Sequence, residues 1–132
     1  MSITGLNHLT LAVSDLERSV QFYSGLLGFV VRWRGTSSAY LEAGTLWLAL
    51  VGNGEAKREP SSAYTHAAFS VAPDALPQWI ERLTEAGVSR WQESERGDSF
   101  YFLDPDGHKL ELHAGDLESR LRARLGEHAP KG

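Results

Sequence analysis

The sequence predicts an α+β fold in which two βαβββ modules follow one another in the chain. Two observations predict this fold class. A strand, a helix and three strands are expected between about residues 3 and 51, and the same order returns between about residues 63 and 114. The segment between them, residues 52–62, is polar and carries glycine and proline, which is typical of a linker. With a last helix at about 116–126, the 132 residues form a single domain of two modules.

The first module begins with a strand and a helix. The stretch NHLTLAV, residues 7–13, alternates apolar and polar side chains and is rich in β-formers, which predicts a strand. The next residues, SDLERSVQFYSGLLG, carry apolar side chains at roughly helical spacing. Ser14 and Glu17 have the spacing of a capping box, and Gly28 is suited to end the helix. Three strands are expected after it, at about 29–34, 38–43 and 45–51.

The second module repeats this order. The stretch YTHAAFSV, residues 64–71, predicts a strand, and PDALPQWIERLTEAG, residues 73–87, predicts a helix that ends at glycine. Strands are expected near 88–92, 99–104 and 108–114. The last two strands are joined by an Asp-Pro-Asp-Gly turn that begins at Asp104.

Composition excludes several classes of protein. The formal net charge is −4 and no basic stripe occurs, so a nucleic-acid partner is not expected. The chain has no cysteine, which excludes thiolate nucleophiles and sulfur-ligated metals. No stretch approaches 18 apolar residues, and the N-terminus lacks a basic region followed by an apolar run. We therefore expect a cytoplasmic protein with no membrane partner.

Two histidines take equivalent places in the two modules. When the modules are superimposed on their first strands, His8 falls opposite His66, and each lies on the polar face of its strand. Glu111 lies between two leucines in the last strand, where an unpaired carboxylate is costly if both faces are covered. Two imidazoles and one carboxylate suit a divalent transition metal that keeps positions open for substrate. A strand histidine is also commonly a hydrogen-bonded structural residue, and this interpretation stays open.

The motifs GLNHLTLAVSDL, YTHAAFSV and DSFYFLDPDGHKLELHAGDLESRL together resemble the vicinal oxygen chelate superfamily. Within it, they are most similar to the fosfomycin-resistance glutathione transferases, over about residues 3 to 125. The resemblance implies that His8, His66 and Glu111 bind a metal, usually Mn²⁺, whose charge compensates the buried Glu111. It also implies that the modules form cupped mixed sheets and that the protein is a domain-swapped homodimer. In that dimer, His8 of one chain meets the partner's His66 and the partner's Glu111.

The same resemblance implies an activity. Such enzymes open the epoxide of fosfomycin by adding the thiol of glutathione, which gives resistance to the antibiotic. The metal polarises the leaving oxygen, and the protein contributes orientation and electrostatics without a covalent nucleophile. The small-molecule partners expected are therefore fosfomycin and glutathione.

Family positions assign roles to further residues of this chain. The resemblance implies that Thr10 hydrogen-bonds substrate oxygens and that Arg120 binds the phosphonate. The full set comprises Thr10, Tyr101 and Arg120 as catalytic residues and Ser99, Tyr64, Tyr40 and Trp47 as substrate-binding residues. Four of these residues also have a structural interpretation: Thr10 as a β-forming threonine, Arg120 as an ion-paired helix arginine, and Tyr40 and Trp47 as packed strand aromatics. His108 and His113 are expected to be structural or to support the ligands.

One loop departs from the family pattern. Family members carry a lysine directly after the tryptophan that matches Trp91, in a loop that also binds K⁺. Here Gln92 takes that place, and the loop of residues 92–98 is one residue shorter. Arg90 and Arg96 lie nearby in the sequence, but a planar guanidinium is not equivalent to a compact ammonium. K⁺ binding and efficiency on fosfomycin are therefore open at this stage.

Three alternatives belong to other classes. The first is an epoxide hydrolase, which needs a glutamate base just before the third strand, where this chain has serines in TSSAYLEAG; Glu42 lies further on. The second is a metal-free drug-binding protein, which would lack the paired histidines and the glutamate. The third is a metal-dependent relative, glyoxalase- or dioxygenase-like, that acts on another chelating substrate. Fold alone does not decide among them, because function depends on the site.

Overall fold

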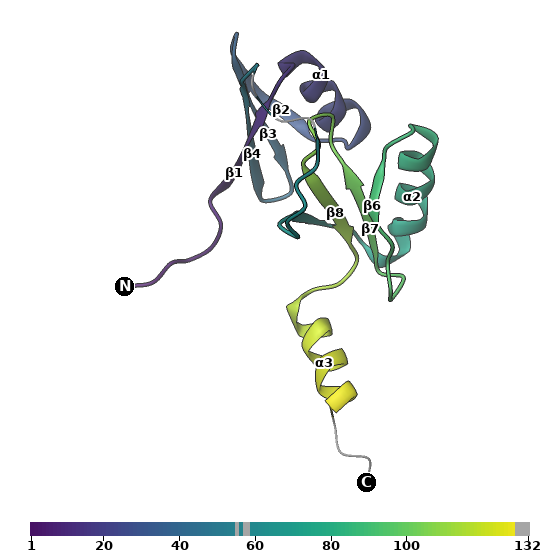
Figure 1. Ribbon diagram of the computed structural model, residues 1–132. Helices are drawn as coiled ribbons and strands as arrows, with labels where there is room; N and C mark the ends of the chain where they lie inside the picture. The colour runs from purple at the N-terminus through teal and green to yellow at the C-terminus, as the bar shows by residue number, and fades with distance from the viewer. Residues whose placement is uncertain (55, 57–58, 129–132) are drawn as a thin grey trace. The chain divides into compact units, whose positions relative to one another are not determined.

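The computed structural model describes residues 1–54, 56 and 59–128 of the chain. Its residues divide into two compact units. The first comprises Met1–Ser62 together with Asp104–His108, and the second comprises Ala63–Leu103 together with Lys109–Gly132. Each unit contains one four-stranded mixed sheet (Figure 1).

The first unit has its strands in the order β1-β4-β3-β2. These are β1 (His8–Val13), β2 (Val30–Arg34), β3 (Ser38–Ala43) and β4 (Leu46–Gly52). Strand β1 runs parallel to β4, and the other neighbours are antiparallel. The helix α1 (Leu16–Val20) continues as a π-helical turn (Gln21–Leu26) and packs on β3 and β4. Its Tyr23 is buried with Val13, Leu41, Leu48 and Leu50, so the core lies between helix and sheet.

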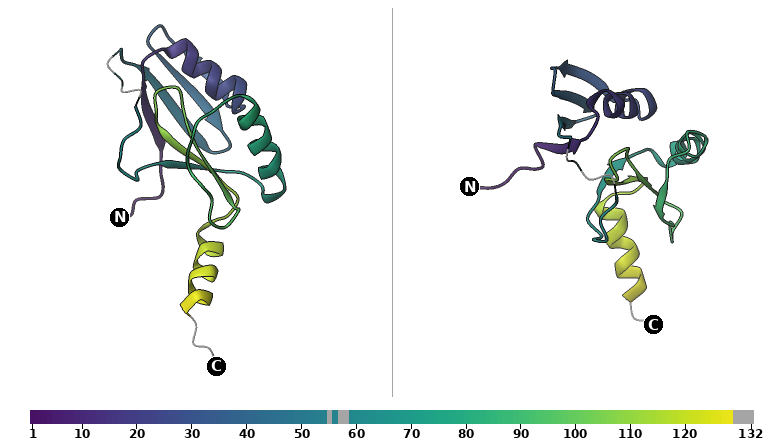
Figure 2. Two further views of the ribbon diagram at one scale, coloured as in Figure 1. Left: turned by 45° about the vertical axis from the view of Figure 1, so that its right-hand side comes forward. Right: turned by 45° about the horizontal axis from the view of Figure 1, so that its top comes forward.

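The second unit has the same topology, with the order β5-β8-β7-β6. Its strands are β5 (Ala67–Ser70), β6 (Arg90–Gln92), β7 (Ser99–Leu103) and β8 (Lys109–His113). A short 3-10 turn (Pro73–Ala75) leads into α2 (Leu76–Glu85), which buries Leu76 and Leu83. Phe100, Phe102 and Leu110 complete this core. The last helix, α3 (Leu117–His128), extends away from the sheet of its unit in all views (Figures 1 and 2).

The predicted fold class is confirmed, since both sheets arise from the order βαβββ. The dimer and the module boundaries stay predictions. Three details of the prediction are wrong. The strand expected at 64–71 is limited to Ala67–Ser70. The helix expected to be continuous over the first module ends in a π-helical turn, where the Ser24 hydroxyl donates to the carbonyl of Val20. The helix cap is Asp15, whose side chain accepts from the Arg18 amide, and not Ser14.

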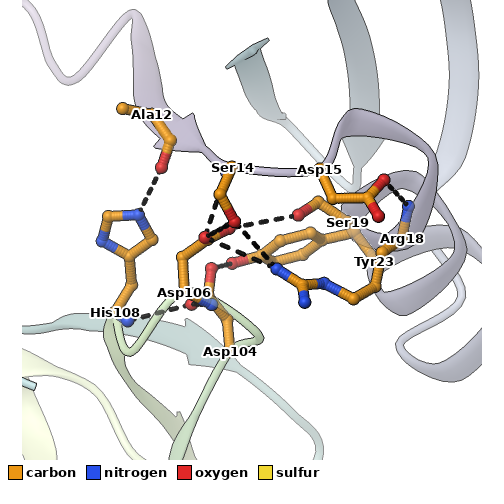
Figure 3. A network of polar contacts seen from close by, with 9 residues as sticks. All are labelled: Ala12, Ser14, Asp15, Arg18, Ser19, Tyr23, Asp104, Asp106 and His108. Atoms are coloured by element: carbon orange, nitrogen blue, oxygen red, sulfur yellow. Dashed lines mark hydrogen bonds and ion pairs between the residues drawn. The ribbon is translucent and has the colours of Figure 1, made fainter. Parts of the chain in front are cut away.

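Ser14 does not cap the helix, because its side chain bonds to the turn at residues 104–108 (Figure 3). This turn belongs to the first unit. Asp106 is 1% exposed, and its carboxylate accepts hydrogen bonds from the Ser14 amide and hydroxyl. Asp104 accepts from the hydroxyl of Tyr23 at 2.8 Å, and the His108 ring contacts the Ala12 carbonyl at 2.8 Å. Gly107 closes the turn with a φ of 81°, which favours glycine. His108 is thus a structural residue of the first unit.

None of the helices in the described part of the chain has the length and apolarity needed to cross a lipid bilayer.

Candidate metal and substrate site

Glu111 is the centre of the candidate site in the second unit. It lies in the middle of β8, between β5 and β7, and is paired with Ala68 on one side and Tyr101 on the other. Leu110 and Leu112 point into the core from the opposite face of the strand, as the period of two requires. Glu111 itself is only 6% exposed, so its charge needs compensation from polar or cationic partners.

His66 provides the first partner and tests whether a metal fits. Its Nδ1 lies 2.8 Å from the carbonyl oxygen of Tyr64, which can only accept, so Nδ1 carries the proton. A neutral His66 then presents the lone pair of Nε2 to Glu111 Oε1, only 2.9 Å away. Two acceptors in this arrangement require a cation between them, either a proton on the ring or a metal ion. The donor set therefore fits a divalent metal, and a ring anchored through its other nitrogen is usual for metal-binding histidines.

Aromatic side chains surround His66. The ring centroids of Tyr64, Trp91 and Tyr101 lie 5.0, 5.3 and 6.1 Å from that of His66. Trp91 is fixed by a hydrogen bond from its Nε1 to the Leu110 carbonyl. Burial raises the pKa of Tyr101, and the charge of Glu111 acts in the same direction. The Tyr101 hydroxyl therefore stays protonated at neutral pH and is available as a donor to an anion.

Ser99 and His113 contact the other oxygen of Glu111. The Ser99 hydroxyl lies 2.6 Å from Glu111 Oε2 and 2.7 Å from His113 Nδ1. His113 Nδ1 is itself 3.1 Å from the same carboxylate oxygen. Ser99 and His113 face each other across the antiparallel pair β7–β8, so the strand register brings them together.

A pocket of about 480 Å³ opens beside this cluster in the second unit. Its wall combines the loop after Trp91, two tyrosines and the face of α3 that carries arginine. The lining residues are Tyr64, Gln92, Glu93, Ser94, Glu95, Arg96, Asp98, Tyr101, Arg120 and Arg124. The lining carries three guanidinium groups and three carboxylates, and its guanidinium groups and tyrosine hydroxyls are the donors available to an anionic substrate group.

The loop of residues 92–98, which departs from the family pattern, has defined contacts in the structure. Gln92 donates from its amide to the Tyr64 hydroxyl at 2.9 Å, so it holds a pocket wall at the position where the family resemblance leads us to expect a lysine. Of the two nearby arginines, Arg96 lines the pocket, whereas Arg90 lies over the ring of Phe100 and 3.7 Å from Glu93. Sequence reasoning missed Arg124. Its spacing of four from Arg120 would have placed both on one face of the helix.

The first unit carries the other predicted site residues. His8 is exposed on β1, with Nδ1 2.8 Å from the side-chain oxygen of Asn7 and its ring centroid 4.3 Å from Trp47. Thr10 is exposed two residues further along the same strand. The ring centroids of Tyr40 and Trp47 lie 5.3 Å apart, and the two residues are 40% and 38% exposed. These aromatic residues thus lie on the open face of the sheet and not in the core.

The structure therefore brings the predicted residues together in two groups. His66, Glu111, Ser99, Tyr64 and Tyr101 form one cluster, with Arg120 at its pocket. His8, Thr10, Tyr40 and Trp47 form a second group on the sheet of the first unit. Within the described residues, no group of three His, Asp or Glu side chains is close enough to hold a metal ion. The pair His66 and Glu111 thus supplies two donors to a metal.

Comparison with known proteins defines the class. The model of the Glyoxalase/Bleomycin resistance protein/Dioxygenase superfamily matches residues 5–112. Together with the repeated βαβββ topology, this match shows that the chain belongs to that superfamily.

Relatives narrow the assignment. Glutathione transferase FosA of Serratia marcescens is 49% identical over 124 residues, which are 92% of this chain and 88% of the relative. Metallothiol transferase FosB of Staphylococcus epidermidis is 42% identical over 126 residues, or 92% and 89% of the two chains. Within the superfamily, the chain is a member of the fosfomycin resistance proteins.

Solved structures agree with this assignment. Fosfomycin resistance protein FosX of Mesorhizobium loti superimposes with a TM-score of 0.77 at 28% identity, over 92% of this chain and 99% of that one. A mutant of FosX from Listeria monocytogenes, complexed with Mn(II) and 1S,2S-dihydroxypropylphosphonic acid, gives a TM-score of 0.78 at 29% identity, with the same coverage.

Proposed function

We propose that the chain is a Mn²⁺-dependent glutathione transferase that opens the epoxide of fosfomycin and thereby confers resistance. The observation that carries the proposal is the pair of His66 Nε2 and Glu111 Oε1, 2.9 Å apart, beside a pocket that contains arginine. The pair suits a divalent cation, and the pocket suits a phosphonate. The 49% identity to a glutathione transferase supports the choice of thiol.

The residues of the second unit bind and orient the substrate in this proposal. Arg120 lies in the pocket wall, where its guanidinium can pair with two phosphonate oxygens. Tyr101 keeps its proton, because burial raises its pKa, and donates to the same group. Tyr64 is held by Gln92 and closes one side of the pocket.

The residues of the first unit provide the remaining ligand and the entrance for the thiol. His8 has Nδ1 anchored on Asn7, so Nε2 is the nitrogen available to a metal. Thr10 donates to an oxygen of the substrate, and Tyr40 and Trp47 offer aromatic surface to glutathione. We propose a homodimer in which His8 of one chain completes the site on the other.

When bound, the metal supplies Lewis-acid stabilisation of the oxygen that leaves the epoxide carbon. The reaction itself forms one sulfur–carbon bond and breaks one carbon–oxygen bond. The released oxygen takes up a proton to become a hydroxyl group. The chain contributes orientation and electrostatic stabilisation, and it needs no covalent nucleophile. A cytoplasmic location accords with the proposal, since the cytosol maintains reduced glutathione.

Hydrolysis of the epoxide is the second candidate, because FosX of Listeria monocytogenes is described with a dihydroxypropylphosphonic acid. In this chain, Glu42 is the carboxylate on the exposed face of β3, and it forms an ion pair with Arg32 at 2.9 Å. Ser37 and Ser38 stand at the start of that strand, where a glutamate base is expected for hydrolysis. These residues favour thiol addition over attack by water.

The experiment that tests the proposal identifies the product. The purified protein is loaded with Mn²⁺ and incubated with fosfomycin, with and without glutathione and K⁺, and the products are analysed by mass spectrometry. We expect a glutathione adduct that depends on the metal and is lost on addition of EDTA and in His66→Ala.

The controls separate the alternatives. A diol formed without glutathione would identify a hydrolase and contradict the proposed transferase. Neither adduct nor diol, despite bound Mn²⁺, would indicate a metal-dependent enzyme with a different substrate. Drug binding without metal, unchanged in His66→Ala, would indicate a drug-sequestering protein. Comparison of rates with and without K⁺ shows whether the shortened loop still responds to that ion.

A further inference from the structure

The carboxylate of Glu111 is held differently at its two oxygens. Oε1 faces His66 Nε2 at 2.9 Å, in the direction that a cation must occupy. Oε2 faces the Ser99 hydroxyl at 2.6 Å and His113 Nδ1 at 3.1 Å. The two sides of one buried carboxylate therefore have separate partners.

The protons on this cluster can be assigned from its geometry. A carboxylate only accepts, so the Ser99 hydroxyl donates its single proton to Glu111 Oε2. His113 Nδ1 lies 2.7 Å from the Ser99 oxygen, which has no second proton to give. Nδ1 of His113 must then carry a proton and donate it to the Ser99 oxygen, while it also lies 3.1 Å from Glu111 Oε2. The result is a directed chain of hydrogen bonds from His113 through Ser99 to Oε2.

The backbone makes this arrangement specific. Ser99 and His113 are register partners of β7 and β8, and Glu111 lies on the same face of β8 as His113. A Cβ atom at position 115 would lie 2.8 Å from His113 Nε2, so Gly115 leaves the space that the ring occupies. Ser99 is 3% exposed. Its hydroxyl is thus directed to the carboxylate.

We propose that His113 and Ser99 are positioning residues for Glu111. They engage Oε2 and orient the carboxylate so that Oε1, beside His66, is the oxygen presented to the metal. The inference rests on the proposed function only in that the site binds a divalent cation. This proposal gives Ser99 a role different from the substrate contact expected from the sequence, because the Ser99 hydroxyl already donates its proton to Glu111.

The test measures affinity for Mn²⁺ by competition with a chromophoric chelator, beside urea unfolding of the metal-free proteins. His113→Leu and Ser99→Ala each remove one donor, and we expect each to weaken Mn²⁺ binding by about 10- to 100-fold. His113→Asn and Ser99→Thr retain a donor at these positions and are expected to restore most of the affinity. Ser70→Ala is the matched control. Ser70 pairs with His113 across β5–β8 but belongs to no part of this chain of bonds.

The outcomes separate this inference from the proposed function. Wild-type Mn²⁺ affinity in both His113→Leu and Ser99→Ala would overturn the positioning role, whatever the enzyme does with fosfomycin. If His113→Leu fails to fold, Ser99→Ala and its threonine rescue decide the same question. A wild-type protein that binds Mn²⁺ but leaves fosfomycin unchanged would refute the proposed function, while the variant affinities still decide the inference. A wild-type protein that binds no Mn²⁺ would overturn both.

Discussion

Buried carboxylates in this protein are compensated in two ways. Asp104 accepts three hydrogen bonds, from the amides of Asp106 and His108 and from the hydroxyl of Tyr23. Glu111 accepts a hydrogen bond from Ser99 on one oxygen, which also lies 3.1 Å from His113 Nδ1, and its other oxygen lies beside His66. The first arrangement is closed within the chain, whereas the second has room for a cation. This contrast distinguishes a structural acid from a candidate metal ligand.

The pH dependence of the free energy of unfolding should reveal the raised pKa of Asp104. Burial raises its pKa above the ordinary value, so the folded protein binds this proton more tightly than the unfolded chain does. The resulting contribution to stability is fully present below the unfolded pKa and is lost as pH rises through the folded pKa. We therefore expect the free energy of unfolding of the wild type, relative to Asp104→Asn, to fall as pH rises from about 4 across this window. Urea unfolding at several pH values measures it, and a constant difference would contradict the assignment.

At the scale of elements, the structural features that depend on residues close together in the chain were predicted well. The strand at 38–43 has the predicted bounds, and His66, predicted from the repeat, lies beside Glu111. Details that depend on distant residues were missed. Ser14 has the spacing of a helix cap, but its hydroxyl donates a hydrogen bond to Asp106, which lies 92 residues away in the chain. Asp15 caps the helix instead. His113 was not assigned to Ser99 because the register of β7 and β8 is set by how their turn folds.

Helix α2 should contribute strongly to the stability of the second unit. Leu83 is fully buried, and Leu76 lies two turns away on the same face. We expect Leu83→Ala to lower the free energy of unfolding by about 2–5 kcal/mol, because it leaves a cavity under the helix. The exposed neighbour Thr84→Ala is the matched control and should change it by less than about 0.5 kcal/mol. Denaturant unfolding followed by circular dichroism measures both, and equal effects would contradict this packing.

At the scale of the whole molecule, the proposed dimer can be tested by complementation. In a dimer that exchanges ligands, a chain with His8→Ala and a chain with His66→Ala share one intact site and one doubly altered site. Refolding the two inactive variants together makes about half of the dimers mixed, so about a quarter of wild-type activity should return. Each variant refolded alone is the control. No recovery would mean that each site is built within a single chain.

The turn at residues 104–108 has a consequence for how the protein folds while it is being synthesised. The first unit includes Asp104–His108, so its polar network joins Tyr23 to a residue 81 positions later. A ribosome that has released the first 62 residues has produced the sheet and helix of that unit but not the acids that bind Ser14 and Tyr23. Closing so long a loop is entropically costly before the intervening strands have formed. The N-terminal half therefore completes its fold only after most of the C-terminal half has been synthesised.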